Sequence, residues 1–257
     1  MKKVKNKKGQ VTIFIIIAVL IIVAVIFLFI LYKNGKLPIS PKPSQEPNQE
    51  VMQCVREAVE DASNMIIDNG GYVKLPNEVK KFENKEYPYL CYTSKNNAKC
   101  QPVNPVLINH IEDEIYDYSL PKAQKCFNDI KAKYEKEGYE VVLEKDMDYE
   151  VVLLSGKIEI NINREFKISK ADDKKGFSKY EIQIPSPIYN IAVVVHTIIE
   201  QEAKYCNSDY PLIMRANTWA NIEKFQTGDD NKIYTVKDTR TNKLWGFAVR
   251  GCVLETP

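Results

Sequence analysis

The feature that most constrains this chain is an unbroken apolar run from Val11 to Tyr32, in which Thr12 is the one polar residue. Because a helix rises about 1.5 Å per residue, the run spans roughly 33 Å, close to the ~30 Å hydrocarbon core of a bilayer. A soluble core helix would show a polar face, and a removable secretion signal would be shorter and end in small residues. The run ends instead in bulky and then basic residues. We therefore expect a permanent transmembrane helix at residues 11–32.

The charges that flank this run predict its orientation. Five lysines precede it and only two follow it closely, so residues 1–10 are expected to be a basic leader in the cytoplasm and the long remainder to lie outside the cell. Without those five lysines the acidic residues outnumber the basic ones, so the net charge of +2 reflects the leader. No basic stripe remains, which argues against a nucleic-acid partner and leaves the lipid bilayer as the first predicted partner.

The six cysteines all lie beyond the predicted span, where an exported domain meets an oxidising environment. An even number at long spacings favours three disulfides over a metal site, since no Cys-x-x-Cys pair occurs, and we expect neither a metal nor another cofactor. Two cysteines flank a short polar turn, and two others fall on the apolar faces of predicted helices. The expected pairs are Cys91 with Cys100, Cys54 with Cys126 and, by remainder, Cys206 with Cys252.

The remaining organisation follows from prolines and hydrophobic periodicity. Four prolines predict an extended tether at residues 33–48, followed by one extracytoplasmic domain at residues 49–257. A helical period predicts a helix that ends at Asn69-Gly70-Gly71, and a second helical region over residues 105–137 that is broken at Pro121.

From Tyr149 the apolar period changes to two, which predicts a three-stranded antiparallel meander with a Ser155-Gly156 turn. A helix capped by Ser186, with Pro187 at its first position, should then form the centre of the core. A hairpin closes the domain across residues 239–242. Helices and antiparallel strands in separate blocks predict an α+β fold, braced by disulfides and preceded by the transmembrane helix.

Two histidines each have a glutamate four residues on, His110 with Glu114 and His196 with Glu200. This spacing suits a metal site, but no third ligand is near, so a surface ion pair or a partly buried histidine is the favoured interpretation. Four acidic residues also lie close together in the second predicted helical region. We interpret them as a solvated helix face rather than a calcium site, because the Asp-x-Asp spacing with glycine of a calcium-binding loop is missing. That cluster consists of Glu112, Asp113, Glu114 and Asp117.

No nucleophile motif, dinucleotide fingerprint or paired carboxylates are recognisable, so we predict no catalytic residues. An exported enzyme stays as an alternative that domain size alone supports. Tyrosine is enriched in binding surfaces, and five tyrosines lie in or near predicted loops, where they could contact a partner. The preferred interpretation is that these five side chains cap a small core. They are Tyr87, Tyr89, Tyr92, Tyr116 and Tyr118.

The stretch "KKGQVTIF" at residues 7–14 resembles the archaeal class III signal peptide, the N-terminus of type IV pilin-like proteins. The resemblance implies cleavage between Gly9 and Gln10 on the cytoplasmic side of the membrane. Phe14 would stand at the fifth mature position, where pilins usually carry a glutamate that helps docking into a filament. The proline-rich tether is a second departure, because pilin helices usually continue into the globular head.

Beyond this stretch the chain is similar, over most of its length, to a group of uncharacterised membrane-anchored proteins of small-genome archaea. The similarity is carried by "YPYLCYT", "GKIEININREFKISK", "QEAKYCNSDY" and "KIYTVKDTRTNKLWGFAVRGC". It implies location in the cell membrane and no activity. We therefore expect a single-pass cell-surface protein whose exported domain serves binding or adhesion to a protein partner. The alternative is a minor pilin-like subunit that self-assembles.

Overall fold

The computed structural model describes residues 16–23, 25–26 and 46–252. Residues 16–23 and 25–26 are helical. The rest of the predicted span, the leader with Gly9 and Gln10, and the predicted tether up to residue 45 lie outside the described residues. Within the described ranges, no helix is long and apolar enough to cross a membrane. Residues from Pro47 onward form a compact unit of their own.

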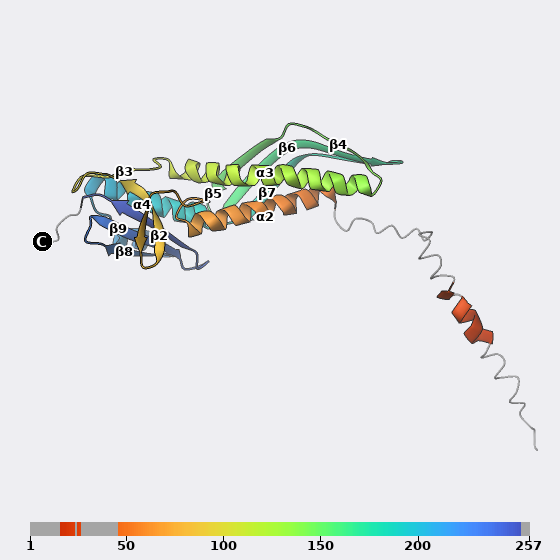
Figure 1. Ribbon diagram of the computed structural model, residues 1–257, viewed down its shortest axis with the longest axis horizontal. Coiled ribbons are helices and arrows are strands. Elements are labelled where there is room, and N and C mark those ends of the chain that lie inside the picture. The colour runs from red at the N-terminus through yellow and green to blue at the C-terminus, as the bar shows by residue number, and fades with distance from the viewer. Residues whose placement is uncertain (1–15, 24, 27–45, 253–257) are drawn as a thin grey trace, which may run out of the picture. The chain divides into compact units, whose positions relative to one another are not determined.

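Two long helices lie side by side in this unit, α2 (Pro47–Asp68) and α3 (Leu107–Lys136) (Figure 1). Most of the apolar stripe of α2 is buried, and the Cys54–Cys126 disulfide joins the helices as predicted. The predicted end of α2 is also confirmed. Gly70 and Gly71 take φ values of +65° and +114°, and the Gly71 N–H donates to the Ile66 carbonyl at 2.8 Å.

The predicted break at Pro121 is wrong, because α3 runs through it without interruption. A proline inside a helix removes an N–H donor and crowds a carbonyl, at a cost of about 3 kcal/mol. Ile115 and Ala123, one on each side of the proline, are completely buried, whereas Pro121 itself is exposed. The burial of both halves against the same core keeps them in one helix despite the local cost.

The predicted meander is confirmed within a four-stranded antiparallel sheet. It comprises β5 (Asp148–Leu154), β6 (Lys157–Lys170) and β7 (Asp173–Pro185), with Gly156 at φ +80° in the first turn. On β6 and β7 the buried face consists of even-numbered residues, including Ile158, Ile160, Ile162, Tyr180, Ile182 and Ile184. On β5 the even-numbered alternation expected from the sequence is wrong, because Leu153 pairs with Ile158 across the two-residue turn, so Tyr149 and Leu153 are buried and Leu154 is exposed. A short strand that we did not predict, β4 (Glu140–Leu143), pairs with the end of β6 that β5 does not reach.

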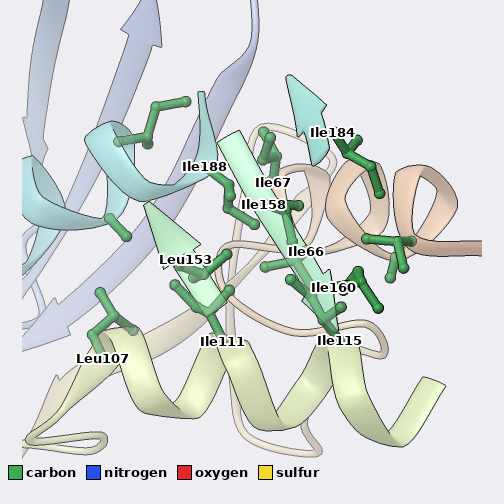
Figure 2. Packing of buried hydrophobic residues seen from close by; sticks show 14 of the residues in the cluster. Ile66, Ile67, Leu107, Ile111, Ile115, Leu153, Ile158, Ile160, Ile184 and Ile188 are labelled. Carbon is green, nitrogen blue, oxygen red and sulfur yellow. The ribbon is translucent and has the colours of Figure 1, made fainter. Parts of the chain in front are cut away.

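Helices α2 and α3 cover the buried face of this sheet. In Figure 2, Ile111 and Ile115 of α3 lie against Ile158 and Ile160 of β6, with Ile66 of α2 beside them. The helices also protect the sheet's open edges. The Leu153 N–H donates to Glu112 at 2.8 Å, and Arg56 donates to the Gln183 carbonyl at 2.9 Å. Side chains thus satisfy edge backbone groups that would otherwise be open to another strand.

Helix α4 (Ile188–Tyr205) contacts both sheets of the unit and is buried along most of its length, as predicted. Its start is shifted by one residue from the prediction, because Pro187 is the N-cap and Ile188 the first helical residue. Ser186 stands one position further out. Its hydroxyl accepts from the Ile188 N–H at 3.3 Å and shares a 2.9 Å hydrogen bond with Ser63.

The second sheet has six strands, and its order is β1-β2-β10-β9-β8 with β3 beside β2. The predicted hairpin of β9 (Asn231–Asp238) and β10 (Leu244–Arg250) is confirmed. The parallel pairing of β10 with β2 was not predicted. The remaining elements are β1 (Val79–Phe82), β2 (Lys85–Tyr92), β3 (Gln101–Pro102), β8 (Ala220–Gln226) and the short helix α5 (Tyr210–Ala216). The domain is therefore α+β, as expected.

The two ends of this second sheet contact each other through side chains. Phe82 on β1 and Phe225 on β8 have ring centroids 5.9 Å apart, although their strands stand at opposite ends of the strand order. Lys80 of β1 forms an ion pair with Asp229 in the turn between β8 and β9. The sheet is therefore curled toward closure, which brings residues from distant parts of the chain to one place.

Candidate functional site

A surface cavity of about 440 Å³ lies where the curled sheet closes. Its volume is in the range of small-ligand sites, roughly 300–1,000 Å³. Aromatic, charged and amide side chains from β1, β2, β10 and the β8–β9 turn converge there. We call it the Tyr89 pocket, and its lining residues are Asn77, Glu78, Val79, Lys80, Tyr89, Tyr92, Asp229, Asn231 and Arg250.

Two tyrosines of β2 form the aromatic part of the Tyr89 pocket. Tyr89 and Tyr92 are three residues apart, a spacing that places side chains on opposite faces of a regular strand. The pairing of β2 with β10 shifts register here, since Tyr89 and Cys91 match the consecutive residues Ala248 and Val249. Such a bulge changes the phase of the strand, and both tyrosines line one pocket with ring centroids 5.1 Å apart.

Tyr89 is held by a buried amide. Its hydroxyl donates to Asn231 Oδ1 at 2.9 Å, and Asn231 Nδ2 donates in turn to the Asp229 carbonyl at 2.9 Å. Asn231 is 4% exposed. Burial raises the pKa of the Tyr89 hydroxyl, with the charge of Asp229 adding to the effect, so the group stays a neutral donor at physiological pH. The ring therefore has a fixed position.

Asp229 and Lys80 neutralise each other within the pocket. Hydrogen bonds from Lys80, from the Thr227 hydroxyl and from Asn231 hold the pKa of the Asp229 carboxyl well below its usual range. Asp229 is therefore ionised at any physiological pH. The ion pair ties β1 to the β8–β9 turn and leaves little net charge on that side of the pocket.

Arg250 is the second cation of the lining, and its side-chain hydrogen bonds are all with neutral groups. Its Nη1 donates to the Tyr92 hydroxyl and its Nη2 to Asn96 Oδ1, both at 3.3 Å. Within the described ranges, no carboxylate pairs with this guanidinium. Asn96 belongs to the loop that the Cys91–Cys100 disulfide closes, and Thr93 of the same loop donates its N–H to the Arg250 carbonyl at 3.1 Å. The disulfide loop therefore supports Arg250.

A second group of charges lies inside the domain between α4 and the six-stranded sheet. Glu202 and Lys232 are each 1% exposed, and Lys232 Nζ donates to Glu202 Oε2 at 2.5 Å. The same ammonium donates to the carbonyls of Cys206 at 2.5 Å and Cys252 at 3.1 Å. The Tyr234 hydroxyl donates to the other oxygen of Glu202, and burial together with that carboxylate raises the pKa of Tyr234. This enclosed network joins α4, β9 and the Cys206–Cys252 disulfide.

The histidine pairs singled out from the sequence have separate surroundings. His110 Nε2 hydrogen-bonds the Gly71 carbonyl at 3.1 Å, and Glu114 accepts from the Val73 N–H at 2.8 Å, so both hold the loop that follows α2. His196 Nδ1 is buried and has no hydrogen-bond partner among the described residues, while Glu200 is exposed. Over residues 16–23, 25–26 and 46–252, no group of three or more metal-ligating side chains is placed to hold a metal ion.

The acidic cluster and the tyrosines are only partly as predicted. Asp113 and Asp117 are exposed, whereas Glu112 and Glu114 accept hydrogen bonds from backbone N–H groups of β5 and of the loop after α2. The tyrosines lie on regular elements rather than on loops. Tyr87, Tyr89 and Tyr92 are on β2, and Tyr116 and Tyr118 are on α3. Of the five, only Tyr89 and Tyr92 line the Tyr89 pocket.

Several residues of the Tyr89 pocket and of the buried Glu202–Lys232 network were not identified from the sequence. Lys80, Asp229, Asn231 and Arg250 carry no local pattern, because strands far apart in the chain bring them together. Glu202 did carry a signal, since it follows Ile198 and Ile199 on the apolar stripe of α4. Lys232 likewise alternates with Tyr234 and Val236 along a buried strand face. A charged residue at a predicted core position is expected to have a buried partner.

In comparisons with protein families, with curated proteins and with solved structures, the chain shows no match.

Proposed function

We propose that this chain is a single-pass cell-surface protein, with a cytoplasmic N-terminus and an exported domain that binds a ligand in the Tyr89 pocket. The observation that carries the proposal is that all six cysteines are paired in disulfides. Stable disulfides are typical of proteins that work outside the reducing cytoplasm. The three bridges join α2 to α3, brace the loop beside the pocket and link Cys252, just after β10, to Cys206 at the end of α4.

The apolar run supports the membrane anchor. In the helical residues 16–23 and 25–26, the large apolar side chains are 48–63% exposed, and no charged residue interrupts them. Water solvates such a surface poorly, whereas the hydrocarbon core of a bilayer accepts it. The lysines before residue 10 set the proposed orientation.

The anchor is tested by cell fractionation and by protease treatment of intact cells that express the full chain. We expect the protein to resist alkaline extraction, and external protease to release a fragment that begins after the apolar run. Replacing Ile17 and Ile22 together by lysine should abolish membrane retention, because each charge in the apolar core costs about 2.5–3.5 kcal/mol. The matched control replaces the same two residues by leucine. Recovery of the unaltered chain in the soluble cytoplasmic fraction would overturn the proposal.

A pilin-like subunit is the second candidate, and the stretch from Lys7 to Phe14 is the observation that favours it. N-terminal sequencing of the native protein would find Gln10 as the first residue if the leader is processed. Electron microscopy of the cell surface then separates the candidates. Ordered fibres with the apolar helix as their core would replace the single anchor by a filament, and an intact leader without fibres would remove the pilin-like candidate.

A further inference from the structure

We propose that the Tyr89 pocket binds a sugar ring that carries one carboxylate, such as a hexuronic acid. In this assignment Arg250 holds the carboxylate, Tyr89 and Tyr92 hold the face of the ring, and the amide and carboxylate side chains bind its hydroxyls. The proposal rests on the proposed binding function of the domain. It does not depend on the membrane anchor.

The carboxylate follows from the charges that line the pocket. Lys80 and Asp229 form an ion pair and cancel each other. Arg250 has only neutral partners, the Tyr92 hydroxyl and the Asn96 amide, both at a long 3.3 Å. A guanidinium presents five donors in a planar fork that matches both oxygens of a carboxylate, and such charge-assisted pairs are about twice as strong as neutral hydrogen bonds. A ligand carboxylate would thus supply the partner that the chain does not.

Glu78 indicates that the ligand carries only one negative charge. This exposed carboxylate lies on the same lining, and no lysine or arginine pairs with it in the part of the chain that the structure describes. A ligand with several negative charges, such as a nucleic acid or a polyphosphate, would meet repulsion from Glu78. A ligand with one carboxylate and neutral hydroxyls avoids that repulsion and leaves Glu78 free to accept hydrogen bonds.

The sugar ring follows from the remaining lining. Tyr89 and Tyr92 offer aromatic surfaces held in place by hydrogen bonds, so little side-chain entropy is lost on binding. Asn77, Glu78 and Asp229 add donors and acceptors suited to hydroxyl groups. Val79 is the one aliphatic residue of the lining, so a branched aliphatic peptide side chain finds little complementary surface there. A ring with apolar C–H faces and a polar edge fits this mixture better than a peptide.

The pocket is organised before any ligand arrives. The Cys91–Cys100 disulfide closes the loop that carries Asn96, and Asn96 positions Arg250. Buried Asn231 positions Tyr89. Groups that are fixed in this way bind at a lower entropic cost, which makes millimolar recognition of a single sugar unit attainable.

Binding is tested by titration calorimetry or ligand-observed NMR on the full chain in a mild detergent, with glucuronate, glucose and a short peptide that ends in a free carboxylate as probes. We expect glucuronate to bind at least tenfold more tightly than glucose and than the peptide. Arg250→Gln should remove this preference over glucose, and Arg250→Lys should keep part of it. The matched control is Arg215→Gln, an exposed arginine of α5 outside the pocket, which should change nothing.

Tyr92→Phe separates the two parts of the site. It keeps the aromatic ring but removes the hydroxyl that accepts from Arg250, so we expect weaker preference for glucuronate with unchanged glucose binding. Intact disulfides by mass and an unchanged circular dichroism spectrum show that each variant is folded. Equal affinity for glucuronate and glucose would overturn the carboxylate assignment, and equal affinity for the peptide would overturn the sugar assignment. Neither outcome bears on the proposed membrane anchor, because cell fractionation tests the anchor separately.

Discussion

Among single residues, the buried lysine of β9 shows how demanding a charge inside this domain is. An ammonium has three N–H donors, and Lys232 directs them at Glu202 and at the carbonyls of Cys206 and Cys252. Removing a charge from water costs several kcal/mol, and only a complete set of partners offsets that cost. The network therefore depends on each of its members, including the two disulfide-linked cysteines whose backbone carbonyls accept from Lys232.

Glu202→Gln should destabilise the domain by about 3–5 kcal/mol, because it leaves the Lys232 ammonium buried without a counter-charge. Urea unfolding followed by circular dichroism measures the change. Glu200→Gln is the matched control on the same helix, and its exposed side chain predicts an effect within about 0.5 kcal/mol. If both variants lose the same stability, the buried ion pair does not have the role assigned to it.

Asp238 is expected to cause part of the loss of domain stability at low pH. The Arg240 guanidinium and backbone N–H groups of Arg240 and Thr241 hold the pKa of this buried carboxyl below its usual range. Because the folded-state pKa is the lower one, the stabilisation is complete above the unfolded pKa of about 4 and is lost as pH falls further. In urea titrations below pH 4, Asp238→Asn should therefore lose less stability than the parent chain. The exposed Asp173→Asn should follow the parent curve, and an unchanged slope in Asp238→Asn would contradict the assignment.

Among the elements, the end of α2 shows how a local signal becomes a tertiary contact. The Asn69-Gly70-Gly71 stop is readable from the sequence, but its close approach to β10 is not. A Cβ on Gly70 would lie 2.2 Å from the Gly246 carbonyl oxygen and 2.8 Å from Pro88. Only glycine therefore fits both the backbone angle and the space at this junction of helix and sheet.

Gly70→Ala and Gly156→Ala together separate backbone strain from steric overlap. Both glycines have positive φ, at +65° and +80°, but nothing lies within 4 Å of a Cβ on Gly156. Gly156→Ala should cost about 1–2 kcal/mol, the strain of the left-handed conformation alone. Gly70→Ala adds a clash with backbone, and we expect a loss of more than about 3 kcal/mol. Equal losses in thermal unfolding would show that the α2–β10 contact yields without cost.

For the whole molecule, the three disulfides differ in what they contribute. Cys54–Cys126 spans 72 residues and Cys91–Cys100 spans nine. The chain-entropy estimate gives about 4.4 kcal/mol of stabilisation for the first and about 2.6 kcal/mol for the second. Of these two bridges, only Cys91–Cys100 closes the loop that contacts Arg250.

Replacing each pair by serines should therefore separate stability from binding. Loss of Cys54 and Cys126 is expected to lower the free energy of unfolding more and to leave glucuronate binding intact in the fraction that folds. Loss of Cys91 and Cys100 should lower it less and weaken binding. Urea unfolding and titration calorimetry on both variants measure these effects, and the reverse ranking would contradict the proposed division of roles.

Much of the fold was predictable because its signals are local. The helical stripe of α2, the even-numbered apolar residues of β6 and the paired cysteines each follow from periodicity or from position on a face. The Tyr89 pocket was not predictable, although two of its tyrosines had been singled out. Arg250, Asn231 and Asp229 lie more than a hundred residues from Tyr89, and no spacing rule connects them.

The sequence by itself determined where the three long helices and the strands of the meander and the hairpin form, which cysteines pair and which faces of α2, β6 and β7 are buried, because periodicity and turn residues encode these over a few turns of chain. The tertiary structure alone decided that α3 continues through Pro121, that β10 lies parallel to β2, and that the second sheet curls until Lys80 meets Asp229. Each of these depends on free energy gained from contacts between distant segments. Such contacts outweigh local preference only once the core has assembled.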